Sequence, residues 1–454
     1  MLFHSIQFIV FFLLLHQIFW RVADQYKKNV LIAASILFYG YWSIPFLIHF
    51  LAIIAINYFF IKLIIKTESR RILTYSIIFN ITNLFLFKYA NSFLYYAGYL
   101  LDLDKLVKFN QSNTIILPLA ISFYTFQIIA FLVDVWRKEI RDVSLARFTL
   151  FIMFFPQLIA GPIMRHREFY MKMDFPALDF KMTKDGIFLF LTGMVKKILI
   201  GDQVGELIAP IWQNPQSYDS VSLFLAIAGF SAQIYGDFSG YTDMARGAAL
   251  MLGYEIPENF LSPYLSRSFS ELWKRWHITL STWLRDYLYI PLGGNRVSEL
   301  KYFSNLMIVM SLGGLWHGNT VNFFIWGFIH GLFLALERYF SRWNFRIFQP
   351  VSWLLVTLGW FAGIIFFRGA DFSTSINFIT SMFSNAGSKN ANHNLILNGV
   401  LLCYVIQLLQ YYKEKFIIFY NRYLNYIIPL FSIFLFFTIV QKQHKIQQFI
   451  YFQF

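Results

Sequence analysis

The chain has 454 residues, of which 57% are hydrophobic and only 14% are charged, whereas soluble domains carry about 25% charged residues. Its 38 Lys and Arg outnumber its 24 Asp and Glu, but the basic residues stand in short clusters between apolar runs. That pattern is typical of loops in a multi-spanning membrane protein and leaves no soluble basic module for binding nucleic acid. The single cysteine, Cys403, excludes an internal disulfide and a thiolate zinc site.

An apolar segment at residues 6–20 is the first predicted element. Residues 1–5 carry no Lys or Arg and no small-x-small site follows the segment, so we expect it to be retained and not cleaved as a signal peptide. Further apolar segments are predicted near 30–42, 46–65, 72–98, 114–133, 148–164, 186–211, 220–253 (two helices), 302–316, 320–336, 351–367, 395–411 and 424–440. A span takes about 20 apolar residues. We therefore predict an all-α, polytopic membrane protein of about ten or eleven transmembrane helices, with short re-entrant or interfacial helices.

Two of these segments are interrupted. Residues 154–162 place two prolines and a glycine inside an apolar run, and non-helical backbone at membrane depth is buried in protein or lines a cavity. Residues 302–336 are all within one apolar stretch, which as a single helix would be about 52 Å long against a hydrocarbon core of about 30 Å. We expect this stretch to split at residues 318–320.

The strongest candidate for a functional residue, His317, stands at that split. It lies in Gly-Gly-Leu-Trp-His-Gly-Asn at 313–319, between Trp316 and Asn319. An imidazole inside an apolar region is costly unless it is paired or used, so the pattern fits either a catalytic residue or a structural histidine bonded to a carbonyl. His330 follows thirteen positions later, about 220° further round a helix, and is expected to be structural.

Residues 268–287 predict an amphipathic helix lying in the membrane interface, opened by Ser268 and Glu271 as a capping box. Its apolar face comprises Trp273, Trp276, Leu280, Trp283 and Tyr287. A second, basic stripe comprises Lys274, His277, Ser281 and Arg285, next to Arg275. This stripe fits a contact with lipid headgroups as well as one with the phosphates of an acyl donor.

Two carboxylates, Asp237 and Asp243, lie between apolar segments, where ionisable groups are functional candidates by default. A structural ion pair of Asp243 with Arg246 is the alternative. Asp134 has the same two interpretations.

The last six residues, Phe-Ile-Tyr-Phe-Gln-Phe at 449–454, form an aromatic tail. More Lys and Arg precede the predicted span 424–440 than follow it, so the positive-inside rule predicts that the tail lies outside the cytoplasm. A chain from residue 441 to 451 can extend about 33 Å, enough to return to the bilayer midplane. An interfacial aromatic anchor is the alternative.

The blocks 237–253 and 257–296, the motif Leu-Trp-His-Gly at 315–318 and the broken segment 155–162 resemble the bacterial branch of the membrane-bound O-acyltransferase (MBOAT) superfamily. That branch acts in alginate O-acetylation, peptidoglycan O-acetylation and teichoic acid D-alanylation. The resemblance covers about residues 110–370. It implies an MBOAT fold with N-terminal transmembrane helices at 1–110, a catalytic core at 111–370, and C-terminal transmembrane helices at 371–454 that end in an acyl-carrier tail.

The resemblance implies that His317 is the family's invariant histidine and His277 its second signature histidine. It also implies that Tyr451 in the tail carries the acyl group transiently. The supporting or donor-binding residues would be Trp316, Asn319, Lys274, Arg275, Arg285, Asp237 and Asp243.

The expected activity is O-acetylation of peptidoglycan at the bacterial inner membrane. Acetyl-CoA or another thioester would be the donor and a periplasmic SGNH-type O-acetyltransferase the partner, with no cofactor or metal. O-acetylation of alginate or another exopolysaccharide, a secondary transporter and a non-catalytic scaffold are the alternatives.

Overall fold

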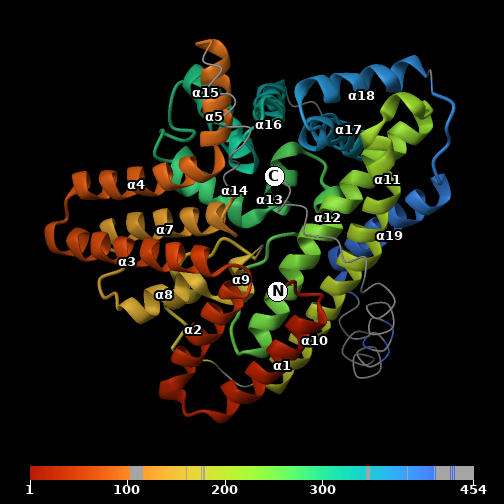
Figure 1. Cartoon of the computed structure of the whole chain (residues 1–454). Helices are drawn as coiled ribbons and strands as arrows, with labels where there is room; N and C mark the ends of the chain where they lie inside the picture. The colour runs from red at the N-terminus through yellow and green to blue at the C-terminus, as the bar shows by residue number, and fades with distance from the viewer. Residues whose placement is uncertain are drawn as a thin grey trace. The chain divides into compact units, whose positions relative to one another are not determined.

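The computed structural model describes residues 1–102, 116–159, 161–174, 176, 179–343, 348–385 and 387–413, with 415, 430, 432 and 434. Over these residues the chain is helical and forms no β-sheet, as predicted, with one isolated bridge between Tyr218 and Lys389 (Figure 1). Most of the predicted segment 424–440 and the whole tail with Tyr451 lie outside the described residues.

The chain divides into two compact units. The first comprises Met1–Ile187 and Ala245–Pro257, and the second Phe188–Met244 and Glu258–Phe454. The division into 1–110, 111–370 and 371–454 stays a prediction.

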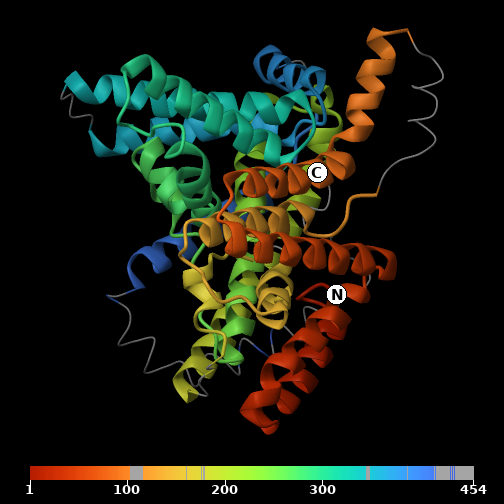
Figure 2. The same cartoon turned by 90° about the vertical axis from the view of Figure 1, so that its left-hand side faces the viewer.

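The first unit is built on helices that lie side by side. Its elements are α1 (Ile6–Arg21), α2 (Asp24–Gly40), α3 (Ile44–Thr67), α4 (Arg70–Lys88), α5 (Ala90–Leu100), α7 (Ile121–Trp136), α8 (Leu145–Met153), α9 (Phe155–Leu158), the π-helical η1 (His166–Tyr170) and the start of α10 (Phe180–Val195). Helices α3, α4 and α7 pack against one another (Figures 1 and 2). Buried Asn57 and Asn80 exchange side-chain hydrogen bonds of 3.1 and 2.7 Å between α3 and α4, which suits helices that meet in an apolar medium.

The predicted break at residues 154–162 is confirmed. Helix α8 ends at Met153, and the four-residue α9 begins after Phe154, whose ψ of 104° is not helical. The side chains of Phe154, Phe155 and Gln157 are buried, so the irregular backbone is covered by protein.

The second unit contains the candidate site. Its elements are the end of α10, the π-helical η2 (Lys196–Asp202), α11 (Gln203–Gln213), η3 (Pro215–Ser217), α12 (Ser220–Met251, up to Met244), η4 (Pro263–Leu265), α13 (Phe269–Arg275), α14 (Ile278–Leu284), the π-helical η5 (Arg285–Tyr289), α15 (Glu299–His317), α16 (Val321–Phe340), η6 (Ser341–Trp343), α17 (Gln349–Arg368), α18 (Phe372–Ser384) and α19 (His393–Tyr411). The predicted split of 302–336 is confirmed, because α15 ends at His317 and α16 begins at Val321.

Two predicted elements are wrong. Residues 220–253 hold one helix of 32 residues, α12, and not two. Its Gly240 does not break it because the glycine accommodates a close helix contact: a Cβ there would lie 2.7 Å from the Gly193 carbonyl oxygen. The single helix over 268–287 is likewise replaced by α13 and α14, with His277 between them in the left-handed conformation (φ 43°, ψ 54°).

Five helices among the described residues are long and apolar enough to cross a membrane: α3, α12, α16 with η6, α17 and α19. A sixth results if the bent pair α4 and α5 counts as one span, while α1 and α7 are apolar but shorter. The chain is a multi-pass membrane protein, and the predicted total of ten or eleven spans stays a prediction.

Helices α15 and α16 pack as a tight hairpin through glycines, and this leads to a first prediction (Figure 2). A Cβ on Gly314 would overlap the carbonyl oxygen of Phe323 and lie 3.0 Å from the Gly327 nitrogen, both of them backbone atoms. We expect Gly314→Ala to force the helices apart and lower the melting temperature in detergent by several degrees. Gly313→Ala is the control, because its new methyl meets only the flexible end of Leu284 at 3.1 Å. Equal melting temperatures for the two variants would contradict the hairpin contact.

Candidate functional site

His317 lies inside a cluster of aromatic rings at the tip of the α15–α16 hairpin. It is the last residue of α15 and is only 4% exposed. Its ring centroid is 4.9 Å from that of Trp316, 5.1 Å from that of Trp326 and 5.3 Å from that of Phe367. The side chains of α15, α16 and α17 thus surround this imidazole.

His277 joins the same cluster from the break between α13 and α14. It is fully buried, its ring stands edge-on to Phe238 of α12 at 4.7 Å, and Trp316 lies at 5.9 Å. The centroids of His277 and His317 are 6.5 Å apart. We call the rings that contact either imidazole the aromatic enclosure, which comprises Phe238, Phe260, Trp316, Trp326 and Phe367.

Burial determines the charge of His277, which lies outside the candidate spans. Desolvation disfavours the imidazolium and lowers the pKa of His277 to about 3. His277 is therefore neutral at physiological pH and offers one N–H donor and one lone pair. An imidazole can take a proton from a reacting group or accept a hydrogen bond from it, and two imidazoles lie here within one cluster of rings.

His330 is connected to the enclosure through an indole. It is fully buried, and its ring lies 4.9 Å from Trp326, which also contacts His317. Trp273 and Trp360 lie 5.4 and 5.6 Å from His330 on other sides. Aromatic rings thus surround His330, and its structural role stays a prediction.

Asp237 and Asp243 form ion pairs with two consecutive lysines of η2. The Lys196 ammonium lies 2.6 Å from Asp243, and the Lys197 ammonium contacts both Asp237 and Asp202, the latter at 2.8 Å. Burial lowers the pKa of Lys197, but the two carboxylates outweigh it and raise that pKa above its usual value. Both aspartates are thus held in buried ion pairs, with Lys196 as a partner of Asp243, and their contribution to the reaction stays a prediction.

One of these ion pairs is close in sequence to a residue that contacts His277. Phe238, whose ring contacts His277, directly follows Asp237 on α12. The ion pair of Asp237 with Lys197 therefore lies one residue away from the ring that contacts the imidazole.

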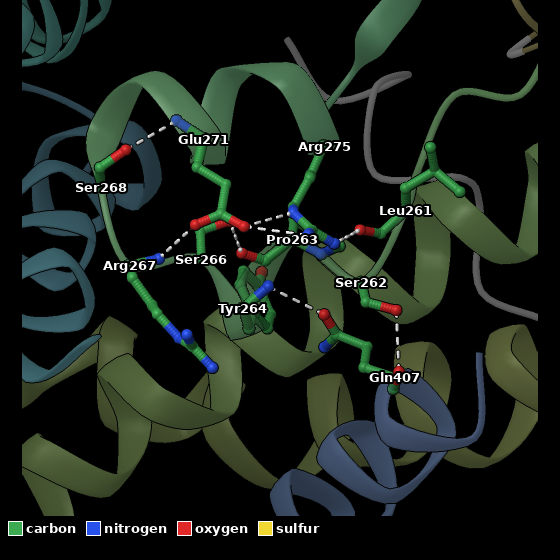
Figure 3. Close-up of polar contacts among 10 residues, drawn as sticks. All are labelled: Leu261, Ser262, Pro263, Tyr264, Ser266, Arg267, Ser268, Glu271, Arg275 and Gln407. Carbon is green, nitrogen blue, oxygen red and sulfur yellow. Dashed lines mark hydrogen bonds and ion pairs between the residues drawn. The ribbon is translucent and has the colours of Figure 1, made fainter. Parts of the chain in front are cut away.

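Arg275 forms hydrogen bonds that stabilise α13 (Figure 3). Its Nε donates to Glu271 at 3.0 Å and its Nη1 to the Leu261 carbonyl at 3.0 Å. Ser268 caps α13 by accepting from the Glu271 backbone at 3.0 Å, whereas the Glu271 carboxylate accepts from the backbone of Arg267 and not of Ser268. Half of the predicted capping box is therefore present.

Hydrogen bonds also connect the loop before α13 to α19. Ser262 donates to the Gln407 carbonyl at 2.8 Å, and the Gln407 side chain accepts from the Tyr264 backbone at 2.9 Å (Figure 3). These hydrogen bonds attach the loop before α13 to α19. His277 follows shortly after α13, so they also help to hold His277 in place.

The remaining predicted residues are more exposed. Lys274 and Arg285 are exposed while His277 is fully buried, so the predicted common basic stripe is not formed. Arg285 pairs with its neighbour Asp286 at 2.6 Å, and Asn319 is exposed in the turn between α15 and α16. Their contact with a donor stays a prediction, as does the role of Tyr451.

One group among the described residues has metal-ligating atoms close together, in the first unit. Its members Asp134 and His166 share a hydrogen bond of 2.7 Å, and Glu139 accepts from Arg167 at 2.7 Å. These partners make the group a hydrogen-bonded ion network, which is the structural interpretation of Asp134.

The sequence did not single out Asn259, Trp326 or Phe367, which complete the surroundings of the two imidazoles. Trp326 and Phe367 are aromatic residues in apolar segments, where such residues are common. Only the fold shows that they face His317.

Comparison with known proteins identifies the same region. The family model for membrane-bound O-acyltransferases matches residues 136–368, which include both imidazoles and the whole aromatic enclosure. The probable alginate O-acetylase of Pseudomonas aeruginosa is 36% identical over 380 residues, covering 81% of this chain and 72% of the relative.

Two further relatives carry other names. The peptidoglycan O-acetyltransferase of Helicobacter pylori is 33% identical over 452 residues, covering 89% of this chain and 82% of the relative. The teichoic acid D-alanyltransferase of Bacillus subtilis is 28% identical over 252 residues, covering 52% of this chain and 62% of the relative. The buried imidazole pair thus lies in an acyltransferase, and the chain belongs to the membrane-bound O-acyltransferase family.

Proposed function

We propose that this protein moves acetyl groups from a cytoplasmic thioester, acetyl-CoA, across the inner membrane for the O-acetylation of cell-wall peptidoglycan. The observation that carries the proposal is the pair of buried imidazoles, His277 and His317, 6.5 Å apart within the aromatic enclosure. An enclosure of this kind excludes water, which would otherwise hydrolyse an activated acyl group. The names of the relatives in Pseudomonas aeruginosa and Helicobacter pylori support acetyl as the group transferred.

In the proposed first step His317 acts as general base. It takes the phenolic proton of Tyr451, and the phenolic oxygen attacks the thioester carbonyl carbon. The C–S bond breaks as the C–O bond forms, and the leaving thiolate takes the proton from the imidazolium. A phenol has a pKa of about 10 and a thiol of about 8.5, so the tyrosyl ester remains able to acylate an alcohol.

In the second step the acetyl group leaves the tail. A hydroxyl of an SGNH-type partner on the periplasmic side attacks the tyrosyl ester, and Tyr451 recovers its proton. The partner then acylates the sugar hydroxyl.

The charge distribution of the α15–α16 hairpin supports access to His317 from outside. Lys301, Arg338 and Arg342 lie at the end opposite the tip, near the start of α15 and the end of α16. From the positive-inside rule we infer that this end faces the cytoplasm and that the His317 tip faces the outer side. A tail on the periplasmic side would then approach His317 from the tip.

The relay is tested on the tail itself. In full-length protein incubated with acetyl-CoA, we expect the peptide containing Tyr451 to gain the mass of one acetyl group by mass spectrometry. Tyr451→Phe removes the attacking oxygen and should abolish both this adduct and O-acetylation in cells. The control Tyr339→Phe removes a phenol from the exposed end of α16 and should change neither. Full O-acetylation in the Tyr451→Phe strain would contradict the relay.

O-acetylation of alginate or another exopolysaccharide is the second candidate, favoured by the 36% identity to the Pseudomonas aeruginosa relative. The two are separated by measuring ester-linked acetate on purified peptidoglycan and on exopolysaccharide from the same deletion strain. Loss of acetate from the exopolysaccharide alone would move the assignment to this candidate.

A further inference from the structure

Three hydrogen-bond donors converge on one side-chain oxygen next to His277. The Oδ1 of Asn259 lies 3.2 Å from His277 Nδ1, 3.1 Å from the Thr279 backbone nitrogen and 2.9 Å from the Thr279 hydroxyl. Asn259 itself is fully buried. An atom that faces a backbone N–H must be an acceptor, so this position holds the amide oxygen and not the amide nitrogen.

This assignment fixes the tautomer of His277. An amide oxygen has no hydrogen to give, so the hydrogen between Asn259 and His277 must reside on Nδ1 of the imidazole. In a neutral imidazole the other nitrogen, Nε2, then carries the lone pair. Nε2 is buried and has no hydrogen-bond partner among the described residues.

Asn259 also holds the backbone at this point. Its carbonyl accepts from the Ile278 backbone N–H at 3.0 Å, and its side chain accepts from that of Thr279. These bonds replace the cap that α14 lacks, because the His277 side chain makes no cap hydrogen bond. They also hold His277 in a left-handed conformation, which is unfavourable for a residue other than glycine.

Two aromatic rings fix the plane of the imidazole. Phe238 stands edge-on to it at an interplanar angle of 88°, and Trp316 meets it at 69°. With the backbone held by Asn259 and the ring held by these neighbours, the lone pair of Nε2 has one fixed direction inside the enclosure. A fully buried acceptor without a partner is costly, which points to a donor group that arrives with the reactants.

We propose that Asn259 is a positioning residue for His277. Because Asn259 keeps the proton of His277 on Nδ1, Nε2 of His277 can only accept a hydrogen bond, and it accepts one from the groups that react beside His317. His277 and His317 then have different tasks: His277 receives a hydrogen bond from a reactant, while His317 takes the proton during the transfer. The second task rests on the proposed function, whereas the tautomer of His277 does not.

The tautomer is measured first, because the measurement needs no activity. Full-length protein labelled with ¹⁵N-histidine is reconstituted in lipid bilayers for solid-state NMR, and His277→Gln identifies the signal of residue 277. We expect a single Nδ1–H tautomer in the wild-type protein and a mixture or the Nε2–H tautomer in Asn259→Leu. The matched control is Thr279→Val, which removes another donor from the same oxygen and should keep the Nδ1–H form. An Nε2–H signal in the wild type, or an unchanged signal in Asn259→Leu, overturns the proposal.

The pH dependence of turnover is measured second, as thiol release from acetyl-CoA by the purified proteins. Asn259→Leu should slow turnover by about 10–100-fold, the effect known for loss of the hydrogen-bond partner that orients a metal-ligating histidine. In Asn259→Asp a carboxylate would face Nδ1–H and raise the pKa of His277, so that Nε2 gains a proton as the pH falls. We expect this variant to approach the wild-type rate at alkaline pH and to lose activity at a higher pH than the wild type, with an unchanged KM.

A purely structural role would lower the rate of Asn259→Asp by the same factor at every pH, and that result overturns the proposal. Absence of thiol release from the wild type would instead contradict the proposed function, and the NMR measurement would still decide the role of Asn259. Protein yield and melting temperature of each variant show whether it is folded.

Discussion

Replacing His317 by alanine should lower the rate of acyl transfer by about 10²–10⁴-fold, the usual effect of removing a general base. The side chain is buried between Trp316, Trp326 and Phe367, so water replaces the imidazole poorly as a proton acceptor. The measurement is thiol release from acetyl-CoA by the purified protein, together with ester-linked acetate on the cell wall. Protein level in the membrane fraction should stay close to that of the wild type.

The control for this variant is His393→Ala. His393 begins α19 and bonds the Ser222 hydroxyl at 2.8 Å, and none of its observed contacts involves the aromatic enclosure. We expect it to keep most of the activity. Normal cell-wall acetylation in the His317→Ala strain would instead support a scaffold that acts only by holding its partner.

Replacing Lys197 by methionine should lower the free energy of unfolding by about 3–5 kcal/mol, because it leaves two buried carboxylates without their shared cation. Lys197 is 1% exposed and contacts both Asp202 and Asp237. Since Phe238 follows Asp237 and contacts His277, activity should fall together with stability. Thermal or denaturant unfolding in detergent gives the difference.

Lys66→Met is the matched control, since Lys66 is exposed near the end of α3 and its loss should change stability by no more than about 0.5 kcal/mol. Adding Asp237→Asn and Asp202→Asn to Lys197→Met removes the charges of the two carboxylates and should restore part of the lost stability. If Lys197→Met unfolds like the wild type, the ion pairs contribute nothing to stability.

The interruptions of the helices were predictable because their causes are local. Prolines at 156 and 162 end or prevent helix within a few residues, and the stretch 302–336 is too long for one span. The position of His317 at a helix end therefore follows from local sequence alone. Its aromatic neighbours from α16 and α17 depend on tertiary packing and could not be predicted.

The position of His277 could not be predicted because periodicity assumes an unbroken helix. Residues 268–287 fit a helical repeat, yet one residue with positive φ redirects the chain and turns His277 inward while Lys274 stays exposed. The hydrogen bond that His277 donates to Asn259 joins residues separated by α13 and η4. The pairing of Asp243 with Lys196, on another helix, is equally invisible to local patterns.

The hairpin of α15 and α16 sets the depth of His317 by contact between main chains. Gly314 and Gly327 meet carbonyl groups of the opposite helix, whereas Leu312, Phe324, Phe328 and Leu332 point outward and are exposed. Side chains on that outer surface can therefore be exchanged to match the thickness or fluidity of a host bilayer without displacing the imidazole. In this pair of helices, the outer side chains can thus adapt to a new lipid environment while the main-chain contacts preserve the position of the imidazole.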